Sequence, residues 1–236
     1  MWQVARNLML VPLIAWAGDR VPDDQKGMLG GLLSIAPPLG ALSGIVLPAG
    51  DAAFDIRLAI IAAMTAAMVL PLLLLADRQQ APPLTIQPTP GDALHARLAA
   101  QRIGMWTARL LMHLSGAALA AYLYFWLRDI DPSMHDGAKT LLFAAGLAIS
   151  VTAALGLGRW SDRSGRAFRV LAWLALVASV TLVLMAVSGA PATAKLAYVL
   201  FVSANATFLA LHASQMLTVL PDAATRARGI GVFNLT

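Results

Sequence analysis

The sequence predicts an all-α, polytopic membrane protein, and three observations lead to this fold class. Hydrophobic residues make up 59% of the 236 residues and charged residues only 12%, which is too little charge to disperse a soluble domain of this size. All 12 acidic residues are aspartates. Helices of soluble proteins are rich in glutamate, so its absence indicates helices whose outer faces contact lipid rather than water. Apolar runs of about 20 residues, the length that crosses a bilayer core, recur along the whole chain.

Seven membrane spans and the start of an eighth helix are predicted in chain order. They cover residues 2–18, 28–48, 58–76, 103–127, 140–157, 170–187 and 196–220, with a helical stub at 229–236. The first span is short and holds Arg6, and the second is rich in glycine. The fourth carries Arg109 and His113, whereas the second, third, fifth and sixth contain no ionisable residue in their cores.

The stretch 77–102 separates two groups of spans. It carries four prolines and shows no apolar periodicity before Ala93, so we expect a linker. Residues 93–100 predict a short surface helix within it, capped by Asp92. Pro22-Asp23 after the first span and Pro221-Asp222 after the seventh each precede a base and a glycine-rich helix start, six helices apart, as two parallel halves would produce. The expected organisation is therefore residues 1–76, the end of one half of the molecule, then the linker 77–102, and then residues 103–236, most of a second half.

Composition also excludes several classes of function. The absence of cysteine rules out disulfides, thiolate metal sites and cysteine nucleophiles. The net charge of +5 comes from basic residues that sit in short loops between apolar runs, so a nucleic-acid partner is not expected. We expect no cofactor and no metal.

The distribution of basic residues predicts the orientation in the membrane. The loops after the first, third, fifth and seventh spans hold eleven of the 17 Lys and Arg residues, and the loops between them hold four. The loops after the first, third, fifth and seventh spans should therefore be cytoplasmic. In this topology the chain starts outside without a preceding span and ends inside an apolar helix. We therefore expect a fragment whose parent chain contributes further helices at both ends.

One motif in the fifth-to-sixth loop resembles a known signature. The segment Gly158-Arg159-Trp160-Ser161-Asp162-Arg163-Ser164-Gly165-Arg166 is similar to the G-x-x-x-D-R/K-x-G-R/K-R/K signature of the major facilitator superfamily. Ala167 stands where the final base would be. If this is the copy between helices 8 and 9, the chain runs from helix 4 to the start of helix 11, in the bundle typical of the superfamily.

The resemblance implies a secondary active transporter, not an enzyme, that works by alternating access in a bacterial inner (plasma) membrane. It implies that the motif loop is a conformational latch, in which Gly158, Asp162, Arg163, Gly165 and Arg166 carry the pattern. By pseudo-symmetry, Asp162 should approach the start of helix 5 near Lys26 and Gly27. The glycines there and at 30 and 31 would permit close backbone approach, and two motif glycines would permit a tight turn.

Polar residues inside the spans are the candidates for a substrate cavity. They cluster on the first, fourth and seventh spans, which the resemblance equates with the cavity-lining helices 4, 7 and 10. These candidates are Arg6, Asn7, Arg109, His113, Asn205, His212 and Gln215. Gly116 continues the Arg109 and His113 face and leaves room for a ligand or for a neighbouring helix.

The substrate expected from these residues is a small polar solute. No acidic residue in the visible spans can pair with Arg6, and an arginine inside a bilayer needs water, an acid or an anion beside it. An anionic substrate is our hypothesis. His113 and His212 are candidate sites for a coupling proton, although such histidines also bond neighbouring helices.

Two other functions fit parts of the sequence. Asp51 and Asp55 form a D-x-x-x-D pair, a spacing that intramembrane prenyltransferases use to hold Mg²⁺. A second aspartate cluster is required, and Asp129 with Asp131 lacks its spacing. The other alternative is a non-transporting descendant of the transporter fold that acts as a sensor or assembly partner.

Overall fold

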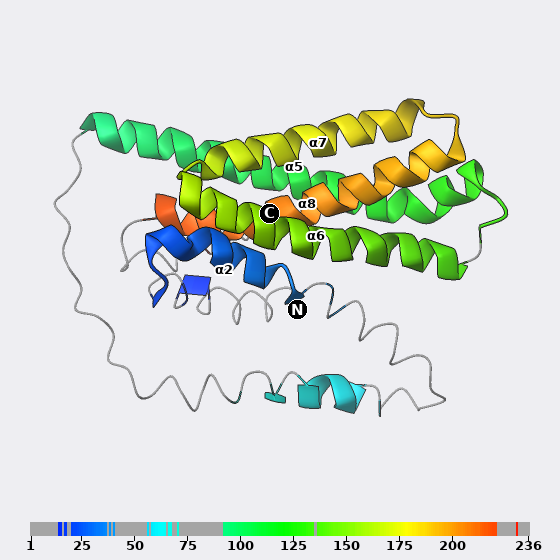
Figure 1. The fold of residues 1–236 in the computed structure, drawn as a ribbon, viewed down its shortest axis with the longest axis horizontal. Helices are drawn as coiled ribbons and strands as arrows, with labels where there is room; N and C mark the ends of the chain where they lie inside the picture. Colours follow the sequence, from blue (N-terminus) through cyan, green and yellow to red (C-terminus); the bar gives the residue numbers. More distant parts are fainter. Residues whose placement is uncertain are drawn as a thin grey trace. The chain divides into compact units, whose positions relative to one another are not determined.

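The computed structural model describes residues 20–36, 92–134 and 136–220, together with residues 14, 15, 17, 38, 40, 56, 58–64, 66, 67, 70 and 230. The regular structure of these residues is helical, as Figure 1 shows. The chain divides into two compact units, residues 1–38 with 88–236 and residues 39–87. The all-α expectation is confirmed.

Four long helices dominate the larger unit. They are α5 (Asp92–Ile130), α6 (Asp136–Ser164), α7 (Ala167–Val187) and α8 (Pro191–Val219). Each holds a segment long and apolar enough to cross a membrane, namely Ala99–Ile130, Gly137–Ser164, Ala167–Val187 and Pro191–Val219. The predicted fourth to seventh spans are confirmed; all four helices begin earlier than expected, and the first two of them also end later.

Helix α8 is the centre of this bundle. It packs against α5, α6 and α7 and buries its large side chains Tyr198, Phe201 and Phe208 almost completely. The neighbouring helices turn large apolar side chains outward, among them Leu141 (70% exposed) and Trp173 (66% exposed). Apolar surface of this extent suits helices that face lipid.

The start of α5 differs from the sequence expectation. We expected residues 93–100 to form a separate surface helix, but the helix runs without a break over 39 residues from Asp92 to Ile130. The reason is local, because no proline follows Asp92 before the span, and alanine, leucine, arginine and glutamine all favour helix. Gly104 alone does not interrupt it.

Turn residues set the other boundaries. After α5, the Oδ1 atom of Asp131 accepts hydrogen bonds from the backbone N–H (3.2 Å) and the hydroxyl (2.6 Å) of Ser133, a typical aspartate turn. Helix α8 begins with Pro191, whose fixed φ suits the first helical position.

A short helix lies against the bundle near the ends of α6 and α8. The 3₁₀ turn Asp23–Gln25 leads into α2 (Lys26–Leu33), which packs against both α6 and α8. It is the described beginning of the predicted second span. The predicted third span lies in the smaller unit, where residues 58–64 are helical. Most of the first span, the stub and the linker lie outside the described residues.

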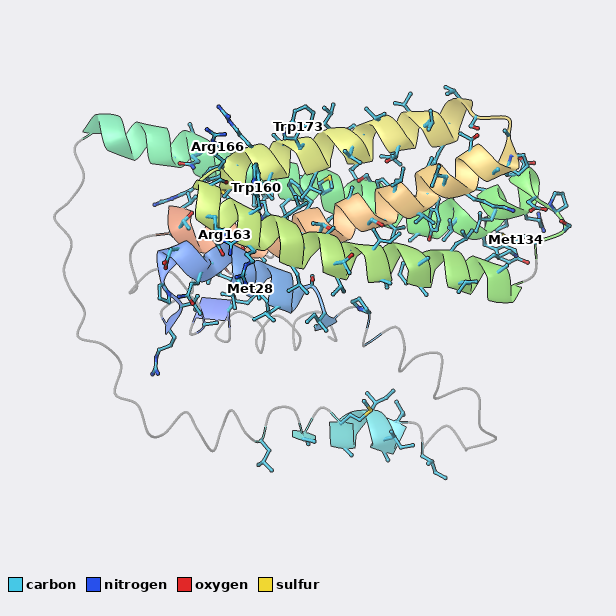
Figure 2. The ribbon with its side chains drawn as sticks, viewed as in Figure 1. Met28, Met134, Trp160, Arg163, Arg166 and Trp173 are labelled. Carbon is cyan, nitrogen blue, oxygen red and sulfur yellow. The ribbon has the colours of Figure 1, made fainter. Side chains whose placement is uncertain are left out.

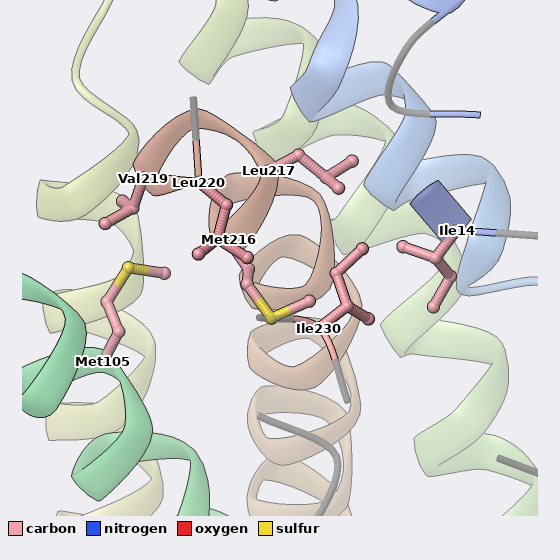
Figure 3. Packing of buried hydrophobic residues seen from close by; sticks show 7 residues of the cluster. All are labelled: Ile14, Met105, Met216, Leu217, Val219, Leu220 and Ile230. Carbon is pink, nitrogen blue, oxygen red and sulfur yellow. The ribbon is translucent and has the colours of Figure 1, made fainter. Parts of the chain in front are cut away.

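A buried apolar cluster joins segments that are far apart in the sequence. Figure 3 shows its seven members, Ile14, Met105, Met216, Leu217, Val219, Leu220 and Ile230. They come from the predicted first span, α5, the end of α8 and the predicted stub. The cluster therefore gathers four predicted helices at one end of the bundle.

Contacts between the ends of the described helices agree with the predicted alternation of their spans. At one end, Asp162 meets the start of α2, and Arg102 Nε donates to the carbonyl oxygen of Val219 at 3.3 Å. At the other end, Lys195 forms an ion pair with Asp131. Each contact joins loops that the alternation places on the same side. Which side is cytoplasmic stays a prediction from the charge count.

Candidate functional site: a helix junction and a polar face

The motif that we expected in a loop is mostly helical. Helix α6 continues through Gly158 and Asp162 to Ser164, so only Gly165 and Arg166 connect it to α7. Gly165 has a φ of +63°, which only glycine adopts readily. The sharp turn thus depends on one glycine of the motif, not on two as we expected. The rest of the motif is the last two turns of a membrane helix.

Asp162 caps the N-terminus of α2 from another helix. Its Oδ1 accepts a hydrogen bond from the Gly27 backbone N–H at 2.6 Å, and its Oδ2 accepts one from Met28 at 2.7 Å. The helix's own N-cap residue, Gln25, makes no side-chain capping bond. Because the first N–H groups of a helix have no internal partner and carry positive partial charge, a carboxylate stabilises them.

Glycines allow the two helices to come this close. A Cβ added at Gly27 would clash with the carbonyl oxygen of Gly158, and one added at Gly158 would clash with that of Gly27. A Cβ at Gly30 would lie 2.6 Å from the Ser214 hydroxyl. A Cβ at Gly31 would lie 3.0 Å from the Ala154 carbonyl oxygen. Helix α2 therefore lies against the backbones of α6 and α8.

The approach of Asp162 to the region of Lys26 and Gly27, predicted from pseudo-symmetry, is confirmed. So is the close approach at Gly27, Gly30 and Gly31. Gly158 serves this contact, not the turn. Lys26 itself is 4% exposed at the start of α2. The latching role of this contact remains a proposal.

The arginines of the motif take no part in the hydrogen bonds of this contact. Arg163 and Arg166 are exposed, and Figure 2 shows them with Trp160 where α6 ends. Arg159 and Arg169 are exposed as well.

The candidate cavity residues on α5 and α8 come together. Arg109 and His113 lie close enough to His212 for their charges to act on it. Arg109 and His113 are half-buried, and His212 is 1% exposed. Arg6 and Asn7, the two candidates on the predicted first span, lie outside the described residues.

His212 is held by a neighbouring helix. Its Nε2 atom lies 3.0 Å from the carbonyl oxygen of Met105 on α5, and its ring stacks on Phe208 at 5.5 Å between centroids. A carbonyl oxygen only accepts hydrogen bonds, so Nε2 must carry the proton. Of our two interpretations, this geometry favours a histidine that hydrogen-bonds a neighbouring helix over a site for a coupling proton.

Asn205 occupies the space beside Gly116. A Cβ added at Gly116 would lie 2.8 Å from the Asn205 amide nitrogen, so a side chain of α8, not an open void, fills this position. The Asn205 Oδ1 atom is buried with no hydrogen-bond partner among the described residues. Gln215, one turn beyond His212, is 7% exposed, and its backbone carbonyl accepts a bond from Thr218.

Two hollows are found in the described part of the chain. One, of about 290 Å³, lies between α5, α7 and α8 and has His212, Phe208 and Met105 in its wall. The other, of about 520 Å³, lies at the far end of α5 beside Trp126 and Arg128. The second hollow contains none of the candidate residues, and the first contains His212 alone among them.

Sequence reasoning missed a row of polar contacts between α6 and α8. Ser203 donates to the carbonyl oxygen of Gly146 at 3.0 Å, and Thr207 donates to that of Ser150 at 3.2 Å. The available signal was the spacing of small residues on α6, at 146, 150, 154 and 158, because small residues four apart let membrane helices approach closely.

The ion pair between Lys195 and Asp131 was also missed. The hydrogen bond from Lys195 is the main cause that lowers the pKa of Asp131, and Ser133 adds to it. The pair joins the end of α5 to the start of α8. No sequence spacing announces it, because 64 residues separate the partners.

Among the described residues, no group of three or more His, Cys, Asp or Glu side chains could hold a metal ion. Asp51 and Asp55, the pair that raised a magnesium interpretation, lie outside these residues.

Comparison with known proteins gives one match. Residues 3–236 match the family model of the Major Facilitator Superfamily. Neither the curated proteins nor the solved structures yielded a match.

Proposed function

We propose, on the premise that the chain belongs to the major facilitator superfamily, that it carries a small anionic solute across a bacterial inner membrane by alternating access. Membership makes the chain a multi-pass membrane protein and a secondary transporter, not an enzyme. The prenyltransferase alternative is thereby set aside. The substrate's charge, the membrane and the mechanism are the parts that we propose.

The observation that carries the mechanism is the capping of α2 by Asp162. Helix α2 belongs to the predicted first half and α6 to the predicted second half, so these two hydrogen bonds would tie the halves together at one end. A carboxylate on a helix N-terminus is strong but local, since its effect falls off within one turn. Separation of the helices by a few ångströms would release it. This is the behaviour required of a latch.

The expected charge of the substrate follows from the polar face of α5 and α8. Arg109 supplies positive charge and His113 a ring that can form hydrogen bonds, and both lie within electrostatic reach of His212. In the four long described helices, aspartates lie only near helix ends, at 92, 129, 136 and 162. A positive field in a low-dielectric setting attracts anions. Arg6 would add to this field. His113 is the better candidate for a coupling proton, because it is half-buried, whereas His212 is 1% exposed and is held by Met105.

The test is uptake by the protein in proteoliposomes, with radiolabelled carboxylates and phosphate esters set against neutral sugars. We expect anions to be carried, and Arg109→Gln to lower their kcat/KM by at least about tenfold. Arg128→Gln is the matched control, because Arg128 lies at the end of α5 beside the Phe125 ring. Equal uptake of neutral sugars, or anion uptake unaffected by both Arg109→Gln and Arg6→Gln, would contradict the proposed substrate class.

A further inference from the structure

The end of α6 presents two chemically different faces. Gly158 and Asp162, four residues apart, share the face that meets α2. Arg159 and Arg163, also four residues apart, share the next face and are exposed. Arg166 and Arg169 continue the exposed basic surface into the start of α7. The motif thus divides into a part that binds protein and a part that faces outward.

The one acidic residue of the motif is not available to neutralise these arginines. Both carboxylate oxygens of Asp162 already accept backbone N–H groups of α2. Within the described residues, none of the four arginines forms an ion pair or hydrogen bond with another side chain. Four exposed guanidinium groups therefore belong to one short stretch of chain, at the end of α6 and the start of α7, without a counter-charge from the described protein.

Aromatic side chains flank this basic surface. Trp160 is 49% exposed, Phe168 44% and Trp173 66%; Figure 2 shows Trp160 and Trp173 at this end of α6 and α7. Beyond them the outer face of α7 is apolar and exposed. Tryptophan prefers the headgroup level of a bilayer. The aromatic residues therefore place the four arginines at the depth of lipid phosphates.

We infer that the surface formed by Arg159, Arg163, Arg166 and Arg169 with Trp160 and Phe168, hereafter the arginine rim, binds the headgroups of anionic phospholipids. Charge complementarity selects the occupant, since guanidinium groups bind phosphate oxygens in a forked geometry. Capping of α2 by Asp162 keeps that carboxylate from competing for the arginines. The inference does not depend on what the protein transports.

The test compares lipids retained by the purified protein. The protein is placed in nanodiscs of equimolar phosphatidylcholine and phosphatidylglycerol, and bound lipids are counted by native mass spectrometry after mild delipidation. We expect Arg163→Gln with Arg166→Gln to lower retained phosphatidylglycerol on the order of tenfold and to leave phosphatidylcholine unchanged. Arg163→Lys with Arg166→Lys should keep most of the retained phosphatidylglycerol, because the positive charge remains.

The matched control removes the same charge at the other end of the bundle. Arg128 and Lys139 lie over the rings of Phe125 and Tyr124, at 5.8 and 4.4 Å from the ring centroids. Arg128→Gln with Lys139→Gln should therefore leave retention near the wild-type value. An equal loss in this control would mean that net charge, not the arginine rim, selects the lipid, and would overturn the inference.

Further outcomes also decide the question. Full retention of phosphatidylglycerol in the variant Arg163→Gln with Arg166→Gln contradicts the inference. Displacement of phosphatidylglycerol by millimolar inorganic phosphate also contradicts it, because this would identify a site for free phosphate. If that variant does not fold, the wild type still provides a test. High salt should weaken phosphatidylglycerol retention relative to phosphatidylcholine, and retention independent of salt would refute the idea. Transport activity enters none of these measurements.

Discussion

At the scale of single residues, Asp162 is the side chain whose role the structure defines most fully. Its two oxygens accept the Gly27 and Met28 N–H groups at 2.6 and 2.7 Å. A charged acceptor makes such bonds stronger than a neutral one. The same residue therefore contributes a helix cap and a contact between the predicted halves.

Replacement of this carboxylate by an amide should open the contact. Asp162→Asn keeps the shape but loses the charge and presents only one acceptor, which we expect to weaken the contact by about 2 kcal/mol. Because the chain contains no cysteine, Met28→Cys can serve as the only thiol, and its rate of maleimide labelling should rise. Asp129→Asn, a change at an exposed aspartate of α5, should leave the rate unaltered. An unchanged rate in Asp162→Asn would argue against the latch.

A second prediction at this scale concerns Asp131 and the pH dependence of the protein's thermal stability. Lys195 lowers the pKa of Asp131 in the folded protein. Such a group stabilises the fold above its unfolded pKa of about 4, and the contribution is lost as the pH falls through the lowered value. The difference in Tm between the wild type and Asp131→Asn should therefore be constant from about pH 5 to 8 and shrink in stronger acid. A difference that shrank instead as pH rose would contradict this assignment.

At the scale of elements, close packing of α2, α6 and α8 depends on the absence of side chains. Gly27 and Gly158 meet backbone to backbone, and Gly30 and Gly31 meet α8 and α6. Further along, Ser203 and Thr207 bond the backbone of α6. Small and hydroxyl residues take these positions because membrane helices gain association energy from close van der Waals contact and interhelical bonds.

Two neighbouring glycines of α6 provide a matched test of this packing. Gly158→Ala should destabilise the protein by about 1–3 kcal/mol, since the new methyl group meets the Gly27 backbone. Gly156→Ala has nothing within 4 Å of its added Cβ, so it should be neutral or stabilise by up to about 1 kcal/mol through helix propensity. Thermal unfolding in detergent measures both. Equal effects of the two changes would show that α2 does not lie against α6 as described.

At the scale of the whole molecule, the question is how the bundle sits in its membrane. Contacts at both ends fix which loops share a side. The excess of basic residues then decides which side faces the cytoplasm. The arginine rim belongs to that basic end.

Cysteine labelling can test this orientation directly. In intact cells, Ser164→Cys should be protected from a membrane-impermeant maleimide, whereas Gly189→Cys, in the link between α7 and α8, should react. Gly189 is exposed and has open space around an added side chain. After permeabilisation both should react. Labelling of Ser164→Cys in intact cells would invert the topology and place the arginine rim on the outer leaflet.

The sequence by itself determined the helical membrane fold, the alternation of the spans and the candidate polar face. These follow from apolar length, charge distribution and residue type, which are local properties of the chain. A signature of nine residues also led to Asp162 and to its partner near Gly27. The continuous α5 and the helical motif were misread, because polar residues near a span end do not by themselves break a helix.

Only the tertiary structure decided which side chains meet. Gly158 lies against Gly27, the Asn205 amide beside Gly116, and His212 against the Met105 carbonyl. Lys195 pairs with Asp131 although 64 residues separate them. The physical reason is that the rotation of each helix about its own axis is fixed only by its neighbours. Sequence periodicity defines the face of a helix but not the angle at which that face turns toward a neighbour, and the packing of small residues between helices sets that angle.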